Sequence, residues 1–393
     1  MTLTSEPSIR DEAAKAGRPA VLQVLPALAS GGTERGAVDV AAALARAGGT
    51  ALVASEGGRL ERELARAGAV HVKLPLASKN PLVMRRNAAA LERLVRAQGI
   101  EIVHARSRAP AWSARAAANR CGAHFVTTFH GVYGAGNPLK RAYNAVMTRG
   151  ERVIAPSEFV AGHIRETYGV EAERLRVIPR GVNLEIFSAD AVTASRVIKL
   201  ATSWRVPDGV KLIMLPARLT RWKGHGLLIE ALTRLGDLEL CCVLLGDDMG
   251  RAGYKRELEA MIAKRDLRSR AFVLGHCNDM AAAYMNADVV VSASTEPEAF
   301  GRTISEAQAM GRPVVASDHG GAREQVLPGV TAFLFEPGNP DALAAALREA
   351  LTLGPEARAH LSAQAEMHVR GKFSRDKMCA KTLALYDEVL RAG

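Results

Sequence analysis

The sequence predicts an α/β protein with two doubly wound parallel sheets, each covered by helices on both faces. Three observations support this prediction. Short apolar runs alternate with amphipathic stretches along the chain, the alternation weakens once near residues 187–210, and 393 residues suffice for two or three domains. In sheets of this kind the carboxyl ends of the parallel strands meet at one edge, so ligands are expected there.

The first half of the chain contains seven apolar segments that predict buried strands. They span residues 20–26, 51–55, 70–74, 100–104, 124–129, 153–156 and 177–179. Amphipathic stretches between them predict helices over residues 33–47, 59–67, 81–97 and 109–121. Strands that alternate with helices of this length form βαβ units and therefore a parallel sheet.

The same alternation restarts after residues 187–210. Strands are predicted at 211–216, 238–245, 271–274, 289–292 and 313–316, and helices at 224–235, 255–265, 280–286, 303–310 and 340–353. We expect a disordered tail (1–18), an N-terminal domain (19–195), a C-terminal domain (196–373) and a last helix (374–393). Ser374 is the expected N-cap of that helix, which should pack back toward the N-terminal domain.

Composition excludes several classes of protein. Hydrophobic residues make up 48% and charged residues 24% of the chain, which is incompatible with a disordered or collagen-like protein. The five cysteines lack a CxxC spacing and suit reduced thiols better than a disulfide scaffold. No apolar run reaches the ~18 residues that cross a bilayer, and no signal peptide is visible. We therefore expect a cytoplasmic protein.

Two loops that follow predicted strands carry glycines or cations. Gly31 and Gly32 lie between the first strand and its helix, where backbone N–H groups can approach a phosphate. A tight strand-to-helix turn explains the same pair equally well. Arg218 and Lys223 follow the first strand of the second half, where cations clamp a diphosphate, although a solvated surface cluster is the alternative.

A third loop, residues 296–306, combines two carboxylates with a helix start. Glu298 lies in the loop, Phe300, Gly301 and Arg302 lie at the predicted start of a helix, and Glu306 lies within that helix. Carboxylates accept hydrogen bonds from sugar and ribose hydroxyls, and helix-start N–H groups suit phosphate oxygens. Glu298 by itself is also explained as an acid that stabilises a helix N-terminus.

These residues together resemble the retaining nucleotide-sugar glycosyltransferases of family 4, which have the GT-B fold of two Rossmann-like domains facing a central cleft. The matching features include Arg218 with Lys223-Gly224, the spacing of Glu298 and Glu306, and residues 311–316. Further matches are Gly320-Gly321 with Glu324, residues 31–34, residues 129–131, and residues 177–183 followed by Phe187. The likeness covers residues 20–390. The sequences of the motifs are most similar to those of bacterial cell-envelope and lipopolysaccharide glycosyltransferases.

The resemblance implies a role for each matching residue. Gly31 and Gly32 would approach the donor diphosphate, which Arg218 and Lys223 would neutralise. Glu306 would bind the ribose, and Glu298 would contact the transferred sugar beside Phe300, Gly301 and Arg302. His130 would lie near the reacting carbon, although a strand-end histidine bonded to backbone is the alternative. Arg180 stands where the family often has Asn before Gly-Val.

The implied reaction needs stabilisation of a leaving nucleoside diphosphate, which two cations and helix-start amides supply. No Asp-x-Asp motif occurs, and none of the ten histidines has the spacing of a zinc pair. We therefore expect metal independence and no cofactor, with a UDP- or GDP-linked sugar as co-substrate. The sequence names neither the base nor the sugar.

The basic excess lies in the half that binds the acceptor in this fold. Residues 1–190 hold 26 Lys and Arg against 17 Asp and Glu, whereas residues 191–393 hold 26 against 24. Arg85, Arg86, Lys140 and Arg141 are interspersed with apolar residues, which suits an anionic membrane surface. Solvated helix faces are the alternative, and nucleic acid is disfavoured because aromatic residues are few.

These observations predict a hexosyltransferase that acts on a lipid-linked or anionic glycan, such as a lipopolysaccharide core, with peripheral contact to the inner face of the cytoplasmic membrane. Two other functions remain open. A soluble glycosyltransferase with a small or polysaccharide acceptor would share every donor residue. A non-catalytic sensor of sugar nucleotides would keep the fold, but the presence of Arg218, Lys223, Glu298 and Glu306 argues against it.

Overall fold

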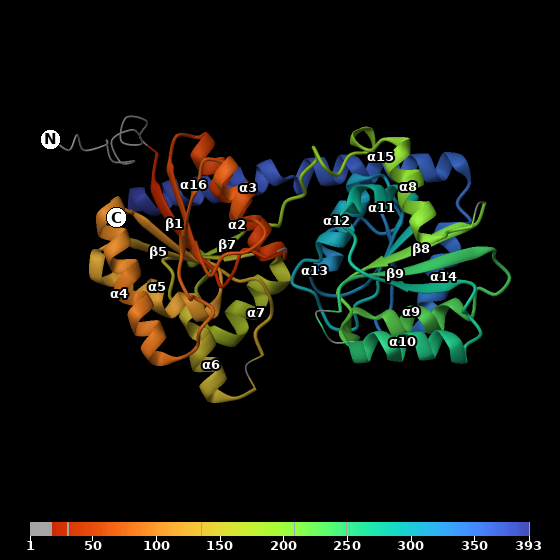
Figure 1. Cartoon of the computed structure of the whole chain (residues 1–393), viewed down its shortest axis with the longest axis horizontal. Coiled ribbons are helices and arrows are strands. Elements are labelled where there is room, and N and C mark those ends of the chain that lie inside the picture. Colours follow the sequence, from red (N-terminus) through yellow and green to blue (C-terminus); the bar gives the residue numbers. More distant parts are fainter. Residues whose placement is uncertain are drawn as a thin grey trace. The chain divides into compact units, whose positions relative to one another are not determined.

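The computed structural model describes residues 18–29, 31–134, 136–207, 209–248, 250 and 252–392, which form two compact units. Unit 1 comprises the described residues up to Gly181 together with those from Arg375 onward, and unit 2 comprises Val182–Ser374. Figure 1 shows each unit as a sheet with helices on both faces, as the sequence predicts. Of the tail expected at residues 1–18, residues 1–17 lie outside the described residues.

Unit 1 is built on a seven-stranded parallel sheet of order β3-β2-β1-β4-β5-β6-β7. Its strands are β1 (Ala20–Val24), β2 (Thr50–Ser55), β3 (Val70–Lys73), β4 (Ile102–Ala105), β5 (His124–Thr128), β6 (Arg152–Ala155) and β7 (Leu175–Val177). Its helices are α2 (Gly32–Arg46), α3 (Glu61–Arg66), α4 (Pro81–Gln98), α5 (Arg108–Cys121), α6 (Pro138–Asn144), α7 (Glu158–Tyr168) and α16 (Arg375–Ala392). β1 is buried along its whole length, as expected for a central parallel strand.

Unit 2 is built on a six-stranded parallel sheet of order β10-β9-β8-β11-β12-β13. Its strands are β8 (Lys211–Pro216), β9 (Leu240–Leu245), β10 (Ala271–Leu274), β11 (Val289–Ser292), β12 (Val314–Ser317) and β13 (Phe333–Phe335). Its helices are α8 (Ala194–Trp204), α9 (His225–Leu232), α10 (Ala252–Lys264), α11 (Met280–Asn286), α12 (Arg302–Ala309), α13 (Gly320–Arg323), α14 (Pro340–Leu351) and α15 (Pro355–Lys372).

Alternate residues of β8 enter two separate cores in unit 2. Ile213 and Leu215 pack with α9, α10 and α14, whereas Leu212 and Met214 pack with α11 and α12. Successive side chains of a strand point to opposite faces, so a continuous apolar run buries both. This burial leaves the strand ends as the places where polar side chains can gather.

The segment 187–210, in which the domain boundary at 195/196 was expected, belongs to unit 2. It contains α8, whose Leu200 and Trp204 pack on the core beside α11. Arg196 of α8 forms two hydrogen bonds with Asp279, at 2.8 and 2.7 Å. The division between units therefore lies earlier, at Gly181–Val182, because these contacts join α8 to the second sheet.

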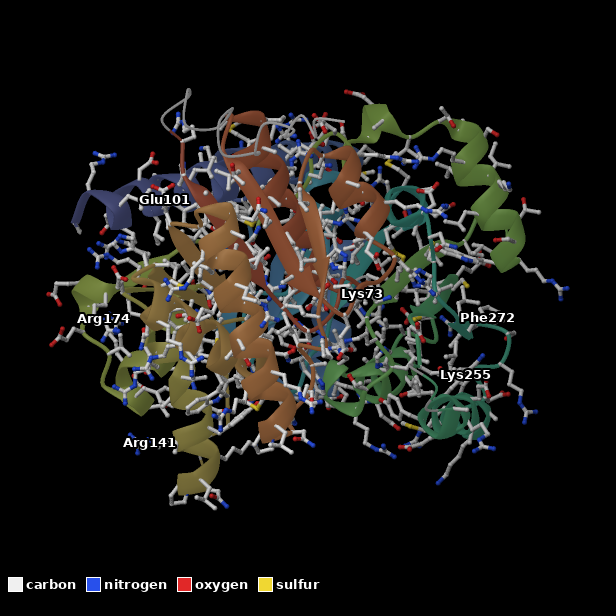
Figure 2. All side chains as sticks on the ribbon, turned by 60° about the vertical axis from the view of Figure 1, so that its left-hand side comes forward. Lys73, Glu101, Arg141, Arg174, Lys255 and Phe272 are labelled. Atoms are coloured by element: carbon white, nitrogen blue, oxygen red, sulfur yellow. The ribbon has the colours of Figure 1, made fainter. Side chains whose placement is uncertain are left out.

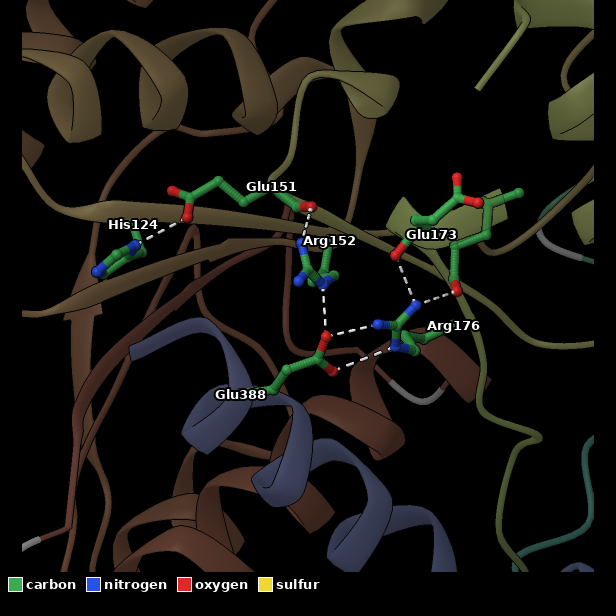
Figure 3. A network of polar contacts seen from close by, with 7 residues as sticks. His124, Glu151, Arg152, Glu173, Arg176 and Glu388 are labelled. Carbon is green, nitrogen blue, oxygen red and sulfur yellow. Dashed lines mark hydrogen bonds and ion pairs between the residues drawn. The ribbon is translucent and has the colours of Figure 1, made fainter. Parts of the chain in front are cut away.

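Helix α16 returns to unit 1 and packs against α2, as predicted for the last helix (Figure 1). Met378, Leu385 and Tyr386 enter the core of unit 1. Figure 3 shows Glu388 of α16 between two arginines of neighbouring strands. Its carboxylate accepts from Arg152 Nε at 2.7 Å and from Arg176 Nε at 3.2 Å, which fixes the helix to the sheet edge.

Among the described residues, no helix combines the length and apolar character that a membrane span needs.

The Glu388 contacts predict a stability that depends on pH. Hydrogen bonds from Arg176, and then from Arg152, hold the pKa of Glu388 below its usual value of 4.5. The contribution to stability is therefore full above pH 4.5 and is lost as pH falls through the lowered pKa. We expect Glu388→Gln to lower the free energy of unfolding by about 0.5–1 kcal/mol at pH 7 and to have less effect in acid.

Thermal unfolding between pH 3 and 7 measures this difference. The exposed Glu349→Gln variant is the matched control and should unfold like the wild type. Equal melting temperatures for Glu388→Gln and the wild type at pH 7 would contradict the prediction.

Candidate functional site

In unit 2, the loop after β8 lies tightly against the end of β11. Gly224 has φ 77°, and a Cβ atom there would lie 1.8 Å from the carbonyl oxygen of Ala293. The backbone N–H of Thr295 donates to the carbonyl of Trp222 at 2.7 Å. Only glycine fits at such an approach, so the Lys223-Gly224 pair places the lysine beside the loop that carries Glu298.

Lys223 and Glu298 form a largely buried ion pair. Lys223 Nζ lies 2.7 Å from Glu298 Oε1, and the two side chains are 15% and 11% exposed. The Ser294 hydroxyl donates to the same carboxylate oxygen, and the ammonium lies 4.3 Å from the centre of the Trp222 ring. Both predicted site residues are thus brought together, with the charge of each compensated by the other.

Arg218 lies in the same loop but is exposed. Its backbone carbonyl accepts from Thr220 N at 2.7 Å, while its guanidinium forms no ion pair with any described residue. An exposed guanidinium keeps five donors for a planar oxyanion ligand. The two predicted cations therefore differ in their surroundings. Lys223 is paired with the Glu298 carboxylate, whereas Arg218 is exposed to solvent.

Helix α12 begins directly after the loop that carries Glu298. Its N-cap residue is Gly301, which has φ 87°. Arg302 Nη2 lies 3.1 Å from Glu306 Oε1, and the Tyr284 hydroxyl donates to Glu306 Oε2 at 3.0 Å. Arg302 Nε is buried without a hydrogen-bond partner among the described residues. The helix start thus combines unpaired N–H groups of its first turn with a further cationic donor.

Tyr284 fixes the orientation of Glu306. Burial, and next the adjacent Glu306 carboxylate, raise the pKa of Tyr284 well above its usual value of 10.0. The phenol therefore remains protonated at neutral pH and acts as a hydrogen-bond donor to the carboxylate. Neither residue composition nor spacing pointed to Tyr284, which lies in the preceding helix α11 and becomes a partner only through packing.

The Gly320-Gly321 pair allows a second close approach to the Glu298 loop. The N–H of Gly321 donates to the carbonyl of Glu298 at 2.8 Å, and a Cβ at Gly321 would lie 2.5 Å from Ala299 O. Gly320 has φ 58° and would place a Cβ 2.7 Å from Glu298 O. Gln325 donates to the carbonyl of Phe300 from the same side. These contacts hold the loop and the start of α12 in one shape.

In unit 1, Gly31 and Gly32 lie at the start of α2, as predicted. A Cβ at Gly31 would meet only the flexible carboxylate of Glu34, at 2.4 Å. The backbone φ of Gly31 is −76°, a value open to any residue. Neither strain nor backbone crowding requires glycine at this position, in contrast to Gly224.

His130 follows β5 and is held by Arg180. Arg180 Nη2 lies 3.1 Å from His130 Nδ1, and 3.4 Å from the carbonyl oxygen of His130. Burial, followed by the nearby Arg180 and Arg106, lowers the pKa of His130 well below 6.5. The ring is therefore neutral at physiological pH and can contact a sugar hydroxyl without carrying charge.

The basic residues of the predicted acceptor side are exposed. Arg85 and Arg86 lie on α4, and Lys140 and Arg141 lie on α6, where Figure 2 marks Arg141. Leu82 and Leu139, at the first turns of the same two helices, are 70% and 81% exposed. Exposed leucines next to exposed cations are the combination that an anionic lipid surface accepts.

The described residues contain no group of three or more His, Cys, Asp or Glu side chains arranged to hold a metal ion. The predicted site residues therefore fall into two sets, one in each unit. Unit 2 brings Lys223 into contact with Glu298 between two loops, and Arg302 into contact with Glu306 within α12. Unit 1 holds Gly31, Gly32 and His130.

Two α/β units, each built on a parallel sheet with helices on both faces, are the architecture of the GT-B class of protein. Residues 30–186 match the family described as Glycosyltransferase Family 4, and residues 199–368 match Glycosyl transferases group 1. The solved structure of a glycosyltransferase from Rickettsia africae ESF-5 is 38% identical, with a TM-score of 0.89 over 96% of this chain and 100% of that chain. The chain belongs to this glycosyltransferase family.

Other similar proteins are more distant. A D-inositol 3-phosphate glycosyltransferase of Xylanimonas cellulosilytica is 34% identical over 251 residues, 61% of this chain and 59% of that relative, so less than two thirds of the relative's length is spanned. Anabaena HepE in complex with UDP-glucose is 24% identical, with a TM-score of 0.81 over 93% of this chain and 99% of that chain. WaaG, a glycosyltransferase involved in lipopolysaccharide biosynthesis, is 18% identical, with a TM-score of 0.73 over the same shares. The likeness to HepE and WaaG concerns the fold.

The close contact at Gly321 predicts that a larger residue at this position lowers the stability of the protein. In Gly321→Ala the new methyl group would collide with the backbone of Ala299, so we expect unfolding to become easier by about 1–3 kcal/mol. Thermal unfolding measures the change. Gly253→Ala, in α10 with nothing within 4 Å of the new methyl group, is the control and should be neutral or stabilising. Equal losses in both variants, or none at Gly321, would contradict the prediction.

Proposed function

We propose that this chain is a retaining glycosyltransferase that moves a hexose-type sugar from a nucleotide diphosphate sugar to an acceptor. The observation that carries the proposal is the Lys223–Glu298 ion pair beside the start of α12. It combines a cation for the leaving phosphate with a carboxylate for sugar hydroxyls, at the strand ends where ligands of such sheets bind. Its membership in the family supports the same class of reaction.

The proposed chemistry follows from where charge develops. Cleavage of the anomeric C–O bond leaves negative charge on the diphosphate, and positive charge grows on the sugar ring. Lys223, Arg218 and the first-turn N–H groups of α12 would stabilise the leaving diphosphate. Glu298 would hold hydroxyls of the transferred sugar, and Glu306, oriented by Tyr284, would accept from ribose hydroxyls.

The neutral imidazole of His130 would contact the sugar near the reacting carbon, while Gly31 and Gly32 would face the diphosphate. We propose that the reaction needs no metal ion and no cofactor, because protein cations supply the charge that a metal would otherwise provide. The donor would carry UDP or GDP, in keeping with the UDP-glucose bound by HepE.

For the acceptor we propose a lipid-linked or anionic glycan, such as a lipopolysaccharide core, met at the inner face of the cytoplasmic membrane. The exposed cations and leucines of α4 and α6 support this choice, and WaaG, which shares the fold, is involved in lipopolysaccharide biosynthesis. A second candidate is a small soluble acceptor, which the similarity to D-inositol 3-phosphate glycosyltransferases favours.

The donor can be identified by a panel of UDP-, GDP- and ADP-sugars tested for protection against thermal unfolding. A ligand that binds only the folded protein stabilises it in proportion to the logarithm of its concentration relative to its Kd. Protection by one nucleotide family names the base. Protection without turnover in the presence of candidate acceptors would instead favour the non-catalytic sensor.

Lys223→Ala should lower kcat/KM for the identified donor by a factor on the order of 10²–10³, because one cation facing the leaving phosphate is removed. Nucleotide release in the presence of EDTA measures the rate. Activity that appears only after Mg²⁺ or Mn²⁺ is added would contradict metal independence. Lys255→Ala, on the outer helix α10 (Figure 2), is the control and should keep wild-type activity. Unchanged activity in Lys223→Ala would overturn the proposed role.

The membrane contact predicts binding to vesicles that contain phosphatidylglycerol and none to vesicles of phosphatidylcholine alone. Each cation near an anionic surface contributes ~1 kcal/mol, so replacing Arg85, Arg86, Lys140 and Arg141 together by Gln should abolish sedimentation with the vesicles. Replacing Arg256, Lys264, Arg265 and Arg268 of unit 2 by Gln removes the same charge and is the control. If the wild type does not bind anionic vesicles, a soluble acceptor becomes the better explanation.

A further inference from the structure

A pocket in unit 1 contains more cationic groups than the proposed transfer step uses. It opens beside His130, and its polar lining consists of His104, Arg106, Thr128, His130, Arg180 and Thr382. Apolar side chains from β6, the end of β7 and α16 complete the wall. All of these residues belong to unit 1, so the pocket is formed within one compact unit.

Arg106 is a buried cation without a counter-ion. Its side chain directly follows β4 and is 5% exposed, and among the described residues it forms no ion pair. Nη1 donates to Gln23 Oε1 at 2.7 Å, and Gln23 Nε2 donates to Ala37 O at 3.0 Å, which fixes the orientation of the amide. Arg106 Nε is buried and has no partner among the described residues.

Burial of the Arg106 guanidinium without an ion-pair partner is unfavourable unless an anion binds to it. Burial lowers the pKa of Arg106, and this effect is opposed by the charges of Tyr386, Cys379, Asp39 and Glu34. Removing a guanidinium from water costs several kcal/mol, and one neutral amide partner does not compensate for that loss. A bound oxyanion at Nε would supply the missing charge.

His130 provides a second hydrogen-bond donor to the same pocket. Because a guanidinium can only donate, the contact between Arg180 Nη2 and His130 Nδ1 places the lone pair of the ring on Nδ1. The proton of the neutral ring is therefore on Nε2. His130 Nε2 is buried and has no partner among the described residues.

The remaining polar groups of the pocket are already paired. His104 Nδ1 lies 2.7 Å from the Tyr386 hydroxyl, and His104 Nε2 lies 2.7 Å from Thr128 Oγ1. Thr382 Oγ1 donates to the carbonyl of Met378 at 2.8 Å. Arg106 Nε and His130 Nε2, which have no hydrogen-bond partner among the described residues, are both donors, and they lie next to a second guanidinium at Arg180. A ligand that accepts hydrogen bonds and carries negative charge fits this set.

We propose that this pocket binds an oxyanion of the acceptor, a phosphate or carboxylate group, through Arg106, His130 and Arg180. The assignment to the acceptor rests on the proposed function, whereas the anion site itself does not. The site would select anionic acceptors over neutral sugars and place them next to His130.

Inorganic phosphate is the probe for the test. The full chain is first saturated with UDP, which occupies the donor site, and is then titrated with phosphate by isothermal calorimetry. Arg106→Gln should weaken phosphate binding about tenfold or more, since a charge-assisted hydrogen bond is lost. Arg180→Asn, at a half-buried position, should weaken it in the same direction and serves if Arg106→Gln does not fold. Arg165→Gln, exposed on α7 of the same unit, is the matched control and should bind like the wild type.

Each alternative gives a different result. Equal phosphate affinity in the wild type, Arg106→Gln and Arg180→Asn overturns the anion site. Phosphate binding to the free protein that Arg106→Gln weakens and UDP abolishes would show that the pocket takes the donor diphosphate, which overturns the assignment to the acceptor. If neither UDP nor GDP binds, the proposed function fails, and the titration of the nucleotide-free protein still decides whether the anion site exists.

Discussion

Burial of both faces of each parallel sheet is the constraint on which the rest of this structure depends. Strands such as β1 and β9 are inaccessible along their whole length, so they can carry almost no charged side chains. Charged and hydrogen-bonding groups are therefore confined to the loops at the strand ends, where successive βα connections lie side by side. Lys223, Glu298, His130 and Arg106 all occupy such loops. Charged and hydrogen-bonding side chains therefore gather at the strand ends because the apolar runs that form the cores occupy the strands themselves.

Confinement to the strand ends brings opposite charges into half-buried contact. Lys223 pairs with Glu298, and Arg302 pairs with Glu306, so each contact joins one cation to one carboxylate. Pairing lowers the cost of removing these charges from water while no ligand is bound. Glycines 224, 320 and 321 allow the backbones of the loops to approach closely enough for the pairs to form. The described residues that line the Arg106 pocket include no carboxylate, and this difference is why the pocket is proposed to receive its anion from a ligand.

Much of this organisation is predictable from the sequence, and the limits have physical causes. All strands of the two sheets except β13 follow from apolar runs, and Lys223, Glu298 and Glu306 follow from their positions after those runs. The short strand β13 and helices α7 and α15 were not predicted. Helix α8 lies in a stretch that shows no strand pattern, and it joins unit 2 because Leu200 and Trp204 pack there and Arg196 bonds to Asp279. Such long-range contacts leave no local periodicity in the sequence.

The sequence by itself determined the fold class, the family and which loops carry the candidate site residues, because these depend on local periodicity and on motifs of a few residues. Only the tertiary structure decided how the charges are paired. Tyr284 becomes the partner of Glu306, and Tyr386 the partner of His104, through contacts between segments 22 and 282 residues apart. Packing likewise gives Arg106 no carboxylate partner among the described residues and fixes the proton of His130 on Nε2. Which side chains form hydrogen bonds and ion pairs depends on their distance in space. Composition and spacing along the chain do not encode that distance.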